Sequence, residues 1–482
     1  MSLPTPQRHT LHTTLAPMFG FLAAGSVAPT AWADAPAATP NDSVVSLPQI
    51  KVDGQEATST FKVDRVTSAK ISQPLLDAPQ SVTIVPQQVL KEQNAQTLQE
   101  VLRNVPGITF MSGEGNLGWG DLFSIRGFSS EQSLTVDGVR DAGMSTRTDT
   151  FNLQQAEVFK GTGSIESGVS AVGGSVNLVS KEAHLGDANK VSAGIGTDSY
   201  RRLTADLNKQ LTDTTAVRIN LMKHYNQVAD RDDVDYDRWG IATSFGFGLG
   251  TDTRFFVDTF YQKDTNTPDG GVPIQRGTDG HRMPGVKRSD WYGDSSLYTQ
   301  ENATTSLTAR FEHDFDWHDA HLRNQTRWER SDNFAVLSPA RFFVADASGK
   351  KTCTGARCAT LGYTGVGPIS QVPGSTVNAY TDYVNNSNTG HGILRGGDFG
   401  LSKRYTILDN QTDFSFTFNT GSLQHAVVSG LEFYHETYGG LKRNAEVPAG
   451  DLFFNMNDPS HSFASTYVTK GEGDPRSVID NA

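Results

Sequence analysis

The sequence predicts a small α+β domain followed by an antiparallel transmembrane β-barrel, and three observations lead to this prediction. An export signal opens the chain. Residues 61–183 then combine one short amphipathic helix with several strand-like runs. Over residues 189–482 the pattern changes to long runs in which apolar and polar residues alternate, as they do in the strands of outer-membrane barrels.

The composition agrees with this fold class and excludes others. Of the 482 residues, 36% are hydrophobic, and the mean hydropathy is −0.41. The chain contains no run of about eighteen apolar residues that would cross a bilayer as a helix. Its 47 glycines suit a protein with many turns. The formal net charge of −12 argues against a nucleic-acid partner, which would require a basic surface.

Residues 1–33 have the features of a secretory signal peptide. Arg8 and His9 precede a modestly apolar run over Leu11–Val27. Ala31-Trp32-Ala33 then supplies the small residues of a cleavage site. A disordered tail is the alternative interpretation. Export of a chain with only two cysteines fits the bacterial envelope.

Residues 34–60 are rich in Ala, Pro, Ser and Asp and are expected to form a flexible linker. One short extended run interrupts this linker: Leu47, Pro48, Gln49, Ile50, Lys51 and Val52. Ile50 and Val52 alternate with polar neighbours, so the run is able to add as a strand to the sheet edge of a partner. Such hexapeptides are common, and the pattern alone is weak.

The segment 61–183 is predicted to be a compact domain. Ser81–Val85 is typical of a strand, and Thr97 and Glu100 have the spacing of a capping box at a helix start. Apolar residues at helical spacing follow and predict one buried helix face: Leu98, Val101, Leu102 and Val105. Short strands are expected afterwards at Phe123–Ile125, Ser133–Val136, Glu157–Phe159 and Ser175–Val179.

Two stretches of the C-terminal part illustrate the alternation. Leu307, Ala309 and Phe311 alternate with polar residues, and Leu322 and Trp328 lie opposite a charged face made by Arg323, Gln325, Arg327 and Glu329. A soluble sandwich would turn its apolar face inward and is the alternative interpretation. A densely charged second face favours a barrel with lipid outside and water inside.

The links between these runs also alternate in length. Those at 212–214, 250–252, 316–319 and 420–422 are short, and those around 226–237, 264–296, 339–403 and from Gly439 onward are long. Short turns on one side and long loops on the other are typical of outer-membrane barrels. About nine strands are expected before Ala482. A plugged barrel needs roughly 22 strands, so the expectation is of an incomplete, truncated barrel.

The two cysteines, Cys353 and Cys358, lie in a polar, Gly-rich segment. A disulfide in an oxidising compartment is favoured over a metal site, because no nearby His or second Cys pair completes a zinc tetrahedron. No metal site in the protein is expected elsewhere.

The region from Asp77 to Lys181 resembles the plug domain of TonB-dependent siderophore receptors. The stretches that carry the resemblance occur in the family's order: Asp77–Val82, Leu98–Gly107, Ile125–Phe128, Val136–Asp141, Asp149–Leu153, Glu157–Gly161 and Gly173–Lys181. The barrel part resembles the family more loosely, through its strand rhythm and through Thr267–Pro273. Two departures are Thr162, where the family usually has Pro, and Glu166–Val169, where it has a Tyr-Gly-Arg-like run. We therefore expect the local geometry at these two places to differ from that of the family.

The resemblance implies a monomeric receptor in outer-membrane lipid, with a plug filling its barrel. TonB and its inner-membrane motor complex would energise it by pulling on a TonB box, for which Leu47–Val52 has the right position. Arg126 and Lys160 match family positions whose basic side chains pair with carboxylates of the barrel wall. The alternative interpretation is that both are ordinary solvated charges.

The resemblance also implies a ferric siderophore as the cargo. Such complexes are often anionic and partly aromatic, and a site for them requires cations and aromatic faces. The candidates are Trp119, Glu131, Met144 and Arg147 in the plug, and Arg276, Arg282, Arg288, Trp291 and Tyr292 in a long loop. Their basic and aromatic character favours a catecholate-type ligand. The alternative interpretation is a solvated charged face.

No catalytic motif is present, so an enzyme is not expected and no cofactor is required; the iron would belong to the ligand. Two other functions stay open. One is a truncated, non-transporting receptor remnant. The other is the same architecture with a different cargo, such as haem, cobalamin or a glycan.

Overall fold

The structure is a computed structural model, and the residues that it describes all lie within the unit Thr58–Ala482. The description begins at Phe61 and ends at Thr469. Within that span it omits 62, 69, 72–73, 77, 79, 111–121, 130–132, 142–147, 163–171, 273–280, 283–285, 294, 296–297, 338–339, 343, 346–350, 353–391, 396–398, 447–452 and 456–467.

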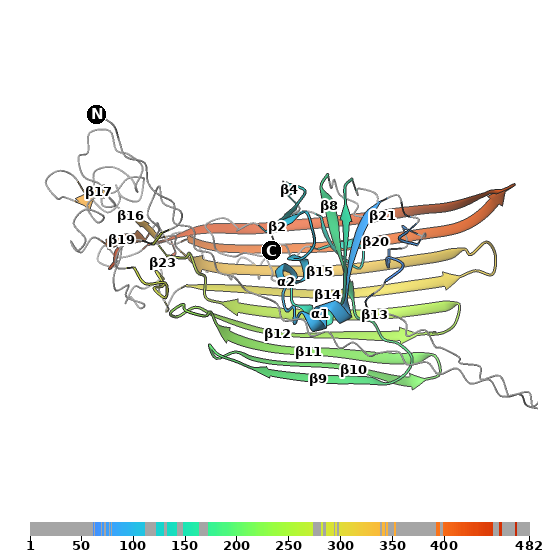
Figure 1. The fold of residues 1–482 in the computed structure, drawn as a ribbon, viewed down its shortest axis with the longest axis horizontal. Coiled ribbons are helices and arrows are strands. Elements are labelled where there is room, and N and C mark those ends of the chain that lie inside the picture. The colour runs from blue at the N-terminus through green and yellow to red at the C-terminus, as the bar shows by residue number, and fades with distance from the viewer. Residues whose placement is uncertain are drawn as a thin grey trace, which may run out of the picture. The chain divides into compact units, whose positions relative to one another are not determined.

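The first part of this unit, the N-terminal domain, is a small α+β fold (Figure 1). Its elements are β1 (Ser81–Pro86), α1 (Gln87–Glu92), α2 (Leu98–Leu102), β2 (Ile108–Phe110), β3 (Phe123–Ile125), β4 (Phe128–Ser129), β5 (Leu134–Val136), β6 (Val139–Arg140), the 3-10 helix η2 (Thr150–Asn152), β7 (Leu153–Lys160) and β8 (Gly174–Ser180). Five strands form one sheet in the order β1-β7-β8-β5-β6, in which only β5 and β8 are parallel. Strands β2, β3 and β4 form a second sheet.

Helix α2 begins where the sequence predicts. The Thr97 side chain accepts a hydrogen bond from the Glu100 backbone N–H, and the Glu100 carboxylate accepts one from the Thr97 N–H. This capping box is therefore confirmed. Helix α1 was not predicted, because it has no side-chain cap and its apolar residues, Val89 and Leu90, are adjacent rather than at helical spacing. No helix among the described residues is long and apolar enough to cross a membrane.

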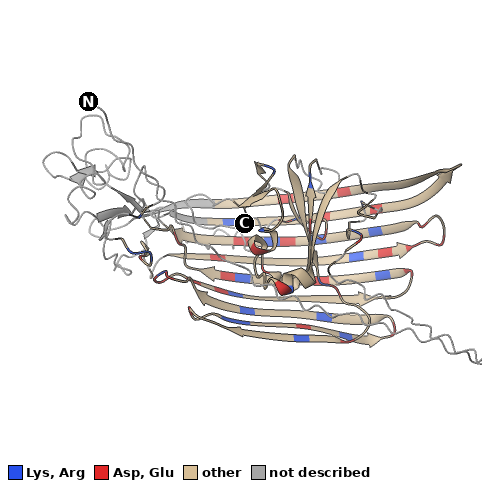
Figure 2. Cartoon of the chain, in the orientation of Figure 1, with Lys and Arg blue, Asp and Glu red and all other residues tan. Residues whose placement is uncertain are grey.

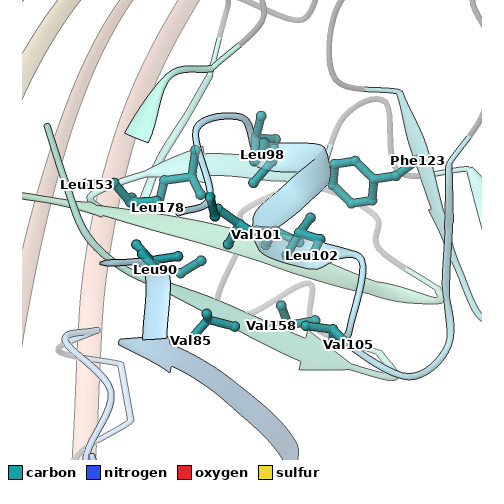
Figure 3. Close-up of a cluster of buried hydrophobic side chains, with 14 of the residues drawn as sticks. Val85, Leu90, Leu98, Val101, Leu102, Val105, Phe123, Leu153, Val158 and Leu178 are labelled. Carbon is teal, nitrogen blue, oxygen red and sulfur yellow. The ribbon is translucent and has the colours of Figure 1, made fainter. Parts of the chain in front are cut away.

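The predicted helix face forms part of the core of the N-terminal domain (Figure 3). Leu98, Val101 and Leu102 lie against strands that contribute Val158 and Leu178, and the side chains of all five are at most 2% exposed. Burial of one such leucine stabilises the fold by about 1.5–3 kcal/mol. The core therefore packs α2 onto one face of the five-stranded sheet and leaves the other face for polar groups.

Two glycines at the start of β8 have no substitute. A Cβ on Gly173 would lie 2.1 Å from the Ile125 carbonyl oxygen, and one on Gly174 would lie 2.1 Å from the Phe159 carbonyl oxygen. Gly174 also has a φ of +143°, a conformation that L side chains rarely adopt. The Gly-Gly pair lets β8 approach two neighbouring strands closely.

The second part of the unit is a single antiparallel sheet, called the wall here. Its nine long strands pair in chain order: β9 (Ala188–Ile195), β10 (Arg201–Thr212), β11 (Thr215–Gln227), β12 (Asp235–Phe247), β13 (Thr253–Asn266), β14 (Thr299–Asp314), β15 (His321–Leu337), β20 (Phe399–Thr420) and β21 (Leu423–Glu446). They run from green to red in Figure 1. The predicted number of strands is confirmed for the described residues.

Short strands occupy the remaining described parts of the links. They are β16 (Ala340–Phe342), β17 (Val344–Ala345), β18 (Lys351–Thr352), β19 (Gly392–Arg395), β22 (Phe453–Asn455) and β23 (Val468–Thr469). Strand β23 pairs with β21, whereas β16, β19 and β22 form a small sheet of their own.

The wall carries polar side chains on its buried face and apolar ones on its exposed face. On β14, Ser306 and Thr308 are buried while Leu307 is 48% exposed. On β15, Arg327 is buried while Trp328 is 38% exposed. A soluble sheet has the opposite arrangement, so this pattern confirms the predicted alternation and matches a wall with lipid on its outer face.

The predicted alternation of short and long links is confirmed, except that the link expected from Gly439 onward starts later, because β21 extends to Glu446. Short turns at 213–214, 248–252, 315–320 and 421–422 join strands at one end of the wall. At the other end, the links grow from 196–200 and 228–234 to 267–298 and 338–398.

A charge on the outer face of the wall is expected to be costly. Leu307→Arg would place a guanidinium in the apolar band and lower the free energy of unfolding by about 2–4 kcal/mol if Leu307 lies near the bilayer midplane. Denaturant unfolding of the protein folded into lipid vesicles measures this loss. Leu307→Phe, which stays apolar, is the matched control. Equal stability of the two variants would contradict the assignment of this face to lipid.

Candidate functional site

Charged side chains make many of the contacts between the N-terminal domain and the wall. Figure 2 marks the positions of the charged residues along the wall strands. Asp149 is central to these contacts and has no exposed side-chain surface. Its Oδ1 and Oδ2 accept from Arg202 Nη2 and Nη1 at 2.7 and 2.9 Å, and Arg238 Nη1 donates to Oδ2 at 3.1 Å. Asp149 Oδ1 also accepts the Phe151 N–H at 2.9 Å, which caps η2. One carboxylate therefore joins this domain to two wall strands.

The charge of Asp149 is maintained by these partners. Burial by itself would raise the pKa of the carboxyl group, but the guanidinium groups of Arg238 and Arg202 and the hydrogen bonds that it accepts hold the pKa below its usual value of 3.8. Arg238 Nε in turn lies 3.2 Å from Asp264 Oδ1 on β13. The ion pair is thus part of a network that continues along the wall.

A second set of contacts lies just after β8. Lys181 Nζ is 3.0 Å from Asp206 Oδ2 and donates to the Phe151 carbonyl at 2.7 Å. The Glu182 carboxylate lies 2.6 Å from Arg310 Nη1. Burial, with the nearby charge of Arg218, lowers the pKa of Lys181 to about 8 although Asp206 opposes the shift. The C-terminal end of the domain is therefore held to the wall by buried charges.

The turn between β5 and β6 contacts the wall through its backbone. Gln325 Nε2 donates to the Asp137 carbonyl at 3.2 Å, and Gln411 Nε2 donates to the Gly138 carbonyl at 3.2 Å. Arg140, at the end of the same hairpin, lies 2.9 Å from Glu436 Oε2 on β21. Residues predicted to line the charged face of β15 thus bind the turn 136–138.

Arg126 and Lys160 lie beside each other. A Cβ built on Gly161 would be 3.7 Å from Arg126 Nη1, and both burial and the charge of Arg126 lower the pKa of Lys160. In the part of the chain that the structure describes, neither side chain has a carboxylate partner. Their pairing with the barrel wall stays a prediction.

The predicted ligand residues of the long links fall into two groups. Trp291 and Tyr292 are 1% and 5% exposed, and Trp291 Nε1 donates to the Pro268 carbonyl at 3.0 Å. Their burial assigns them a packing role in this conformation, with Trp291 against Val234 and Tyr298. Arg282 and Arg288 are exposed, and Arg288 Nε lies 3.3 Å from Asp230.

The links 228–234 and 267–298 are held together beneath these arginines. Arg231 Nη2 lies 2.5 Å from Asp269 Oδ1, and Arg231 Nη1 donates to the carbonyls of Arg288 and Asp290. Asp269 belongs to the Thr267–Pro273 stretch that the sequence singled out. These contacts of Arg231 hold the link in place, and Arg288 lies exposed at its surface.

Several predicted residues lie outside the described residues. These are the hexapeptide Leu47–Val52, the candidate ligand residues Trp119, Glu131, Met144, Arg147 and Arg276, and the cysteines Cys353 and Cys358. Their roles stay predictions. Among the described residues, no three His, Cys, Asp or Glu side chains are grouped so as to hold a metal ion.

Sequence reasoning missed Asp149 and its two arginines. Asp149 occurs in one of the stretches that resemble the family, but no motif names Arg202 or Arg238. The sequence pointed to these arginines only through the alternation of the strands, which places both side chains on the inward face.

Comparison with known proteins agrees with this architecture. Residues 74–175 match the family model of the TonB-dependent Receptor Plug Domain. The chain is 35% identical over 409 residues to the catecholate siderophore receptor Fiu of Escherichia coli K12, covering 82% of this chain and 49% of Fiu. It is 37% identical over 279 residues to the probable TonB-dependent siderophore receptor PiuA of Acinetobacter baumannii, covering 57% of this chain and 37% of PiuA.

Solved structures give the same result. The closed form of the ferric-catecholate import receptor Fiu from E. coli K12 superposes with a TM-score of 0.68 at 31% identity, covering 85% of this chain and 54% of that one. Its open form gives 0.66 at 30% identity, covering 85% and 57%. The chain spans about half the length of the curated relatives that it matches.

A mixed α+β domain joined by buried charges to a wall whose apolar face points outward is the architecture of a TonB-dependent receptor. The chain belongs to this family of outer-membrane proteins of Gram-negative bacteria. Within the family it is similar to siderophore receptors such as Fiu and PiuA.

The Asp149 ion pairs generate a prediction. Asp149→Asn removes the carboxylate partner of Arg202 and leaves Arg238 with Asp264 alone, so it is expected to lower the free energy of unfolding by about 3–5 kcal/mol. Asp237→Asn, which removes an exposed partner of Lys223, is the control and should change it little. Thermal or denaturant unfolding measures both.

The same pair sets a pH dependence. Because the folded-state pKa of Asp149 is lowered, its stabilisation is complete above the ordinary value of 3.8 and is lost as the pH falls through the folded value. Stability should therefore fall below about pH 4, and less steeply in Asp149→Asn. Identical slopes would show that Asp149 does not contribute.

Proposed function

We propose that this protein is a TonB-dependent importer of ferric siderophores, with a catecholate-type complex as its cargo. The observation that carries the proposal is the contact between the N-terminal domain and the wall. This contact is made by ion pairs and by wall side chains that donate to backbone carbonyls, together with a small apolar contact of Phe151 with Met222 and Ala242. Water can replace such polar contacts one at a time, so a pull on the domain can release the domain from the wall in steps.

Space inside the contact supports this proposal. One cavity of about 480 Å³ lies between α1 and strands β9 and β10, lined by Lys91, Lys181 and Arg202. Another, of about 550 Å³, lies between β8 and strands β11, β14 and β15, lined by Arg218, Arg310 and Arg323. Polar cavities of this size hold water, and water lowers the barrier to separating the two faces.

The ligand class follows from charge. Arg282 and Arg288 are exposed in a protein whose formal net charge is −12, and a cationic patch attracts an anionic complex. Catecholate complexes of iron are anionic, and Fiu, to which the chain is similar, is a catecholate siderophore receptor. The iron belongs to the cargo. The proposal includes no resident cofactor and no catalysed reaction.

The remaining assignments complete the proposal. Residues 1–33 are removed as a signal peptide, and 34–60 form a linker that carries the TonB box at 47–52. Residues 61–183 form the plug, and 189–482 belong to the barrel. Cys353 and Cys358 form a disulfide, and Arg126 and Lys160 pair with carboxylates of the barrel wall.

The TonB box can be tested by breaking its strand. Ile50→Pro removes a backbone N–H and prevents strand addition to a partner. We expect loss of energised ferric-catecholate uptake with unchanged binding to de-energised cells, measured with radiolabelled iron. Ala38→Pro, in the same linker, should leave uptake intact. Uptake that survives Ile50→Pro would place the box elsewhere.

The ligand class can be tested by removing charge. Arg282→Gln with Arg288→Gln should weaken ferric-catecholate binding about tenfold and leave a neutral hydroxamate complex unaffected, because only the anionic complex loses Coulomb attraction. Lys209→Gln, at the opposite end of the strands, is the control. Equal weakening of both ligands would argue against the catecholate assignment.

A further inference from the structure

Glu157 is a completely buried carboxylate on β7, on the polar face of the five-stranded sheet. Its Oε1 accepts from the Thr67 backbone N–H at 2.7 Å, from Thr67 Oγ1 at 3.1 Å and from Gln155 Nε2 at 2.8 Å. Its Oε2 accepts from Asn177 Nδ2 at 2.9 Å. A buried carboxylate is tolerated only when its oxygens are hydrogen-bonded.

Two of these four donors come from Thr67. That residue precedes β1 and is exposed at the surface, yet both of its donors reach a carboxylate that has no exposure. Thr67 therefore covers Glu157. When Thr67 leaves, one carboxylate oxygen loses two of its three partners, and water must enter to replace them.

A cavity large enough for water lies next to this site. Thr67 lines the cavity of about 550 Å³ described above, and so do Asn177 and Gly138. Undocking of Thr67 would open Glu157 to that cavity without unfolding the sheet.

The network continues from Glu157 to the wall. Asn177 Oδ1 accepts from the Gly138 N–H at 2.9 Å and from Thr135 Oγ1 at 3.0 Å. Gly138 belongs to the turn 136–138, whose carbonyls accept from Arg323, Gln325, Arg327 and Gln411 of the wall. An unbroken series of hydrogen bonds therefore joins the segment before β1 to the face that holds the domain in place.

We propose that Thr67 and Glu157 form a latch that couples the segment before β1 to the wall contacts of the turn 136–138. When Thr67 is bound to Glu157, it excludes water from the carboxylate, and Glu157 then holds Asn177 against the turn. When the segment is pulled, the latch opens, Glu157 becomes hydrated, and Asn177 loosens the turn from the wall. Glu157 is a positioning residue in this role, which rests on the proposed import function.

Amide hydrogen exchange tests the latch without any ligand. Thr67→Pro removes both donors and should accelerate exchange in peptides that cover 134–140 and β8 about tenfold. Thr67→Val, at this exposed position, removes only the hydroxyl and should have a smaller effect of the same kind. Thr67→Ser keeps both donors and should match the wild type, as should the neighbouring change Ser68→Ala.

A double-mutant cycle tests whether the effect of Thr67 depends on the carboxylate of Glu157. In the Glu157→Gln background no carboxylate has to be hydrated, so Thr67→Val and Thr67→Pro should change exchange at 134–140 by at most about twofold. Faster exchange confined to the residues around Thr67 would overturn the proposal. An undiminished effect of Thr67 in the Glu157→Gln background would overturn it as well.

Transport gives a second measurement. Glu157→Gln should leave ferric-catecholate binding to de-energised cells unchanged and lower the initial rate of energised uptake about tenfold. Unchanged uptake would overturn the latch, as would weakened binding in proportion to uptake. If the wild type imports no siderophore while the exchange cycle holds, the latch stands and the proposed cargo is wrong.

Discussion

The association of the N-terminal domain with the wall depends on one constraint: the charged side chains on the buried face of the wall need partners. Burying Arg238, Arg310 or Arg327 without a partner would cost several kcal/mol each, because charges in a protein interior require compensation. The N-terminal domain supplies part of that compensation through Asp149 and Glu182, and through the backbone carbonyls of the turn 136–138. Carboxylates of the wall itself supply the rest: Asp264, Glu312 and Glu329. The domain thus completes the pairing of the wall arginines, and the polar contacts that join the two parts can be exchanged for water.

Local and periodic features could be predicted from the sequence. The capping box at Thr97, the buried face of α2 and the alternation around Leu307 all depend on residues within a few positions of one another. The contacts that join the two parts could not be predicted. Asp149 and Arg238 are 89 positions apart, and Thr67 and Glu157 are 90 apart. No spacing rule connects such pairs, since the packing of elements that are distant in the sequence decides which side chains meet.

The buried Trp291 shows what composition leaves open about a residue in a long link. Trp291 and the exposed Arg288 are close in sequence, and together they resembled a ligand-binding surface. The structure separates them: Trp291 packs with Val234 and Tyr298 inside the joined links, while Arg288 remains at the surface. An aromatic residue in a long link has two uses, because it contacts ligands or gives the link a core of its own. Only the three-dimensional arrangement distinguishes them.

The strand order β1-β7-β8-β5-β6 has a consequence for mechanical loading. The first strand in the chain is an outermost member of the sheet, and the last, β8, is the central one. A force applied from the N-terminal side therefore meets an edge that can be peeled while β7, β8 and β5 stay paired. A force from the C-terminal side would have to extract the middle of the sheet. The domain is consequently expected to yield to a force on its N-terminal end more readily than to a force on its C-terminal end.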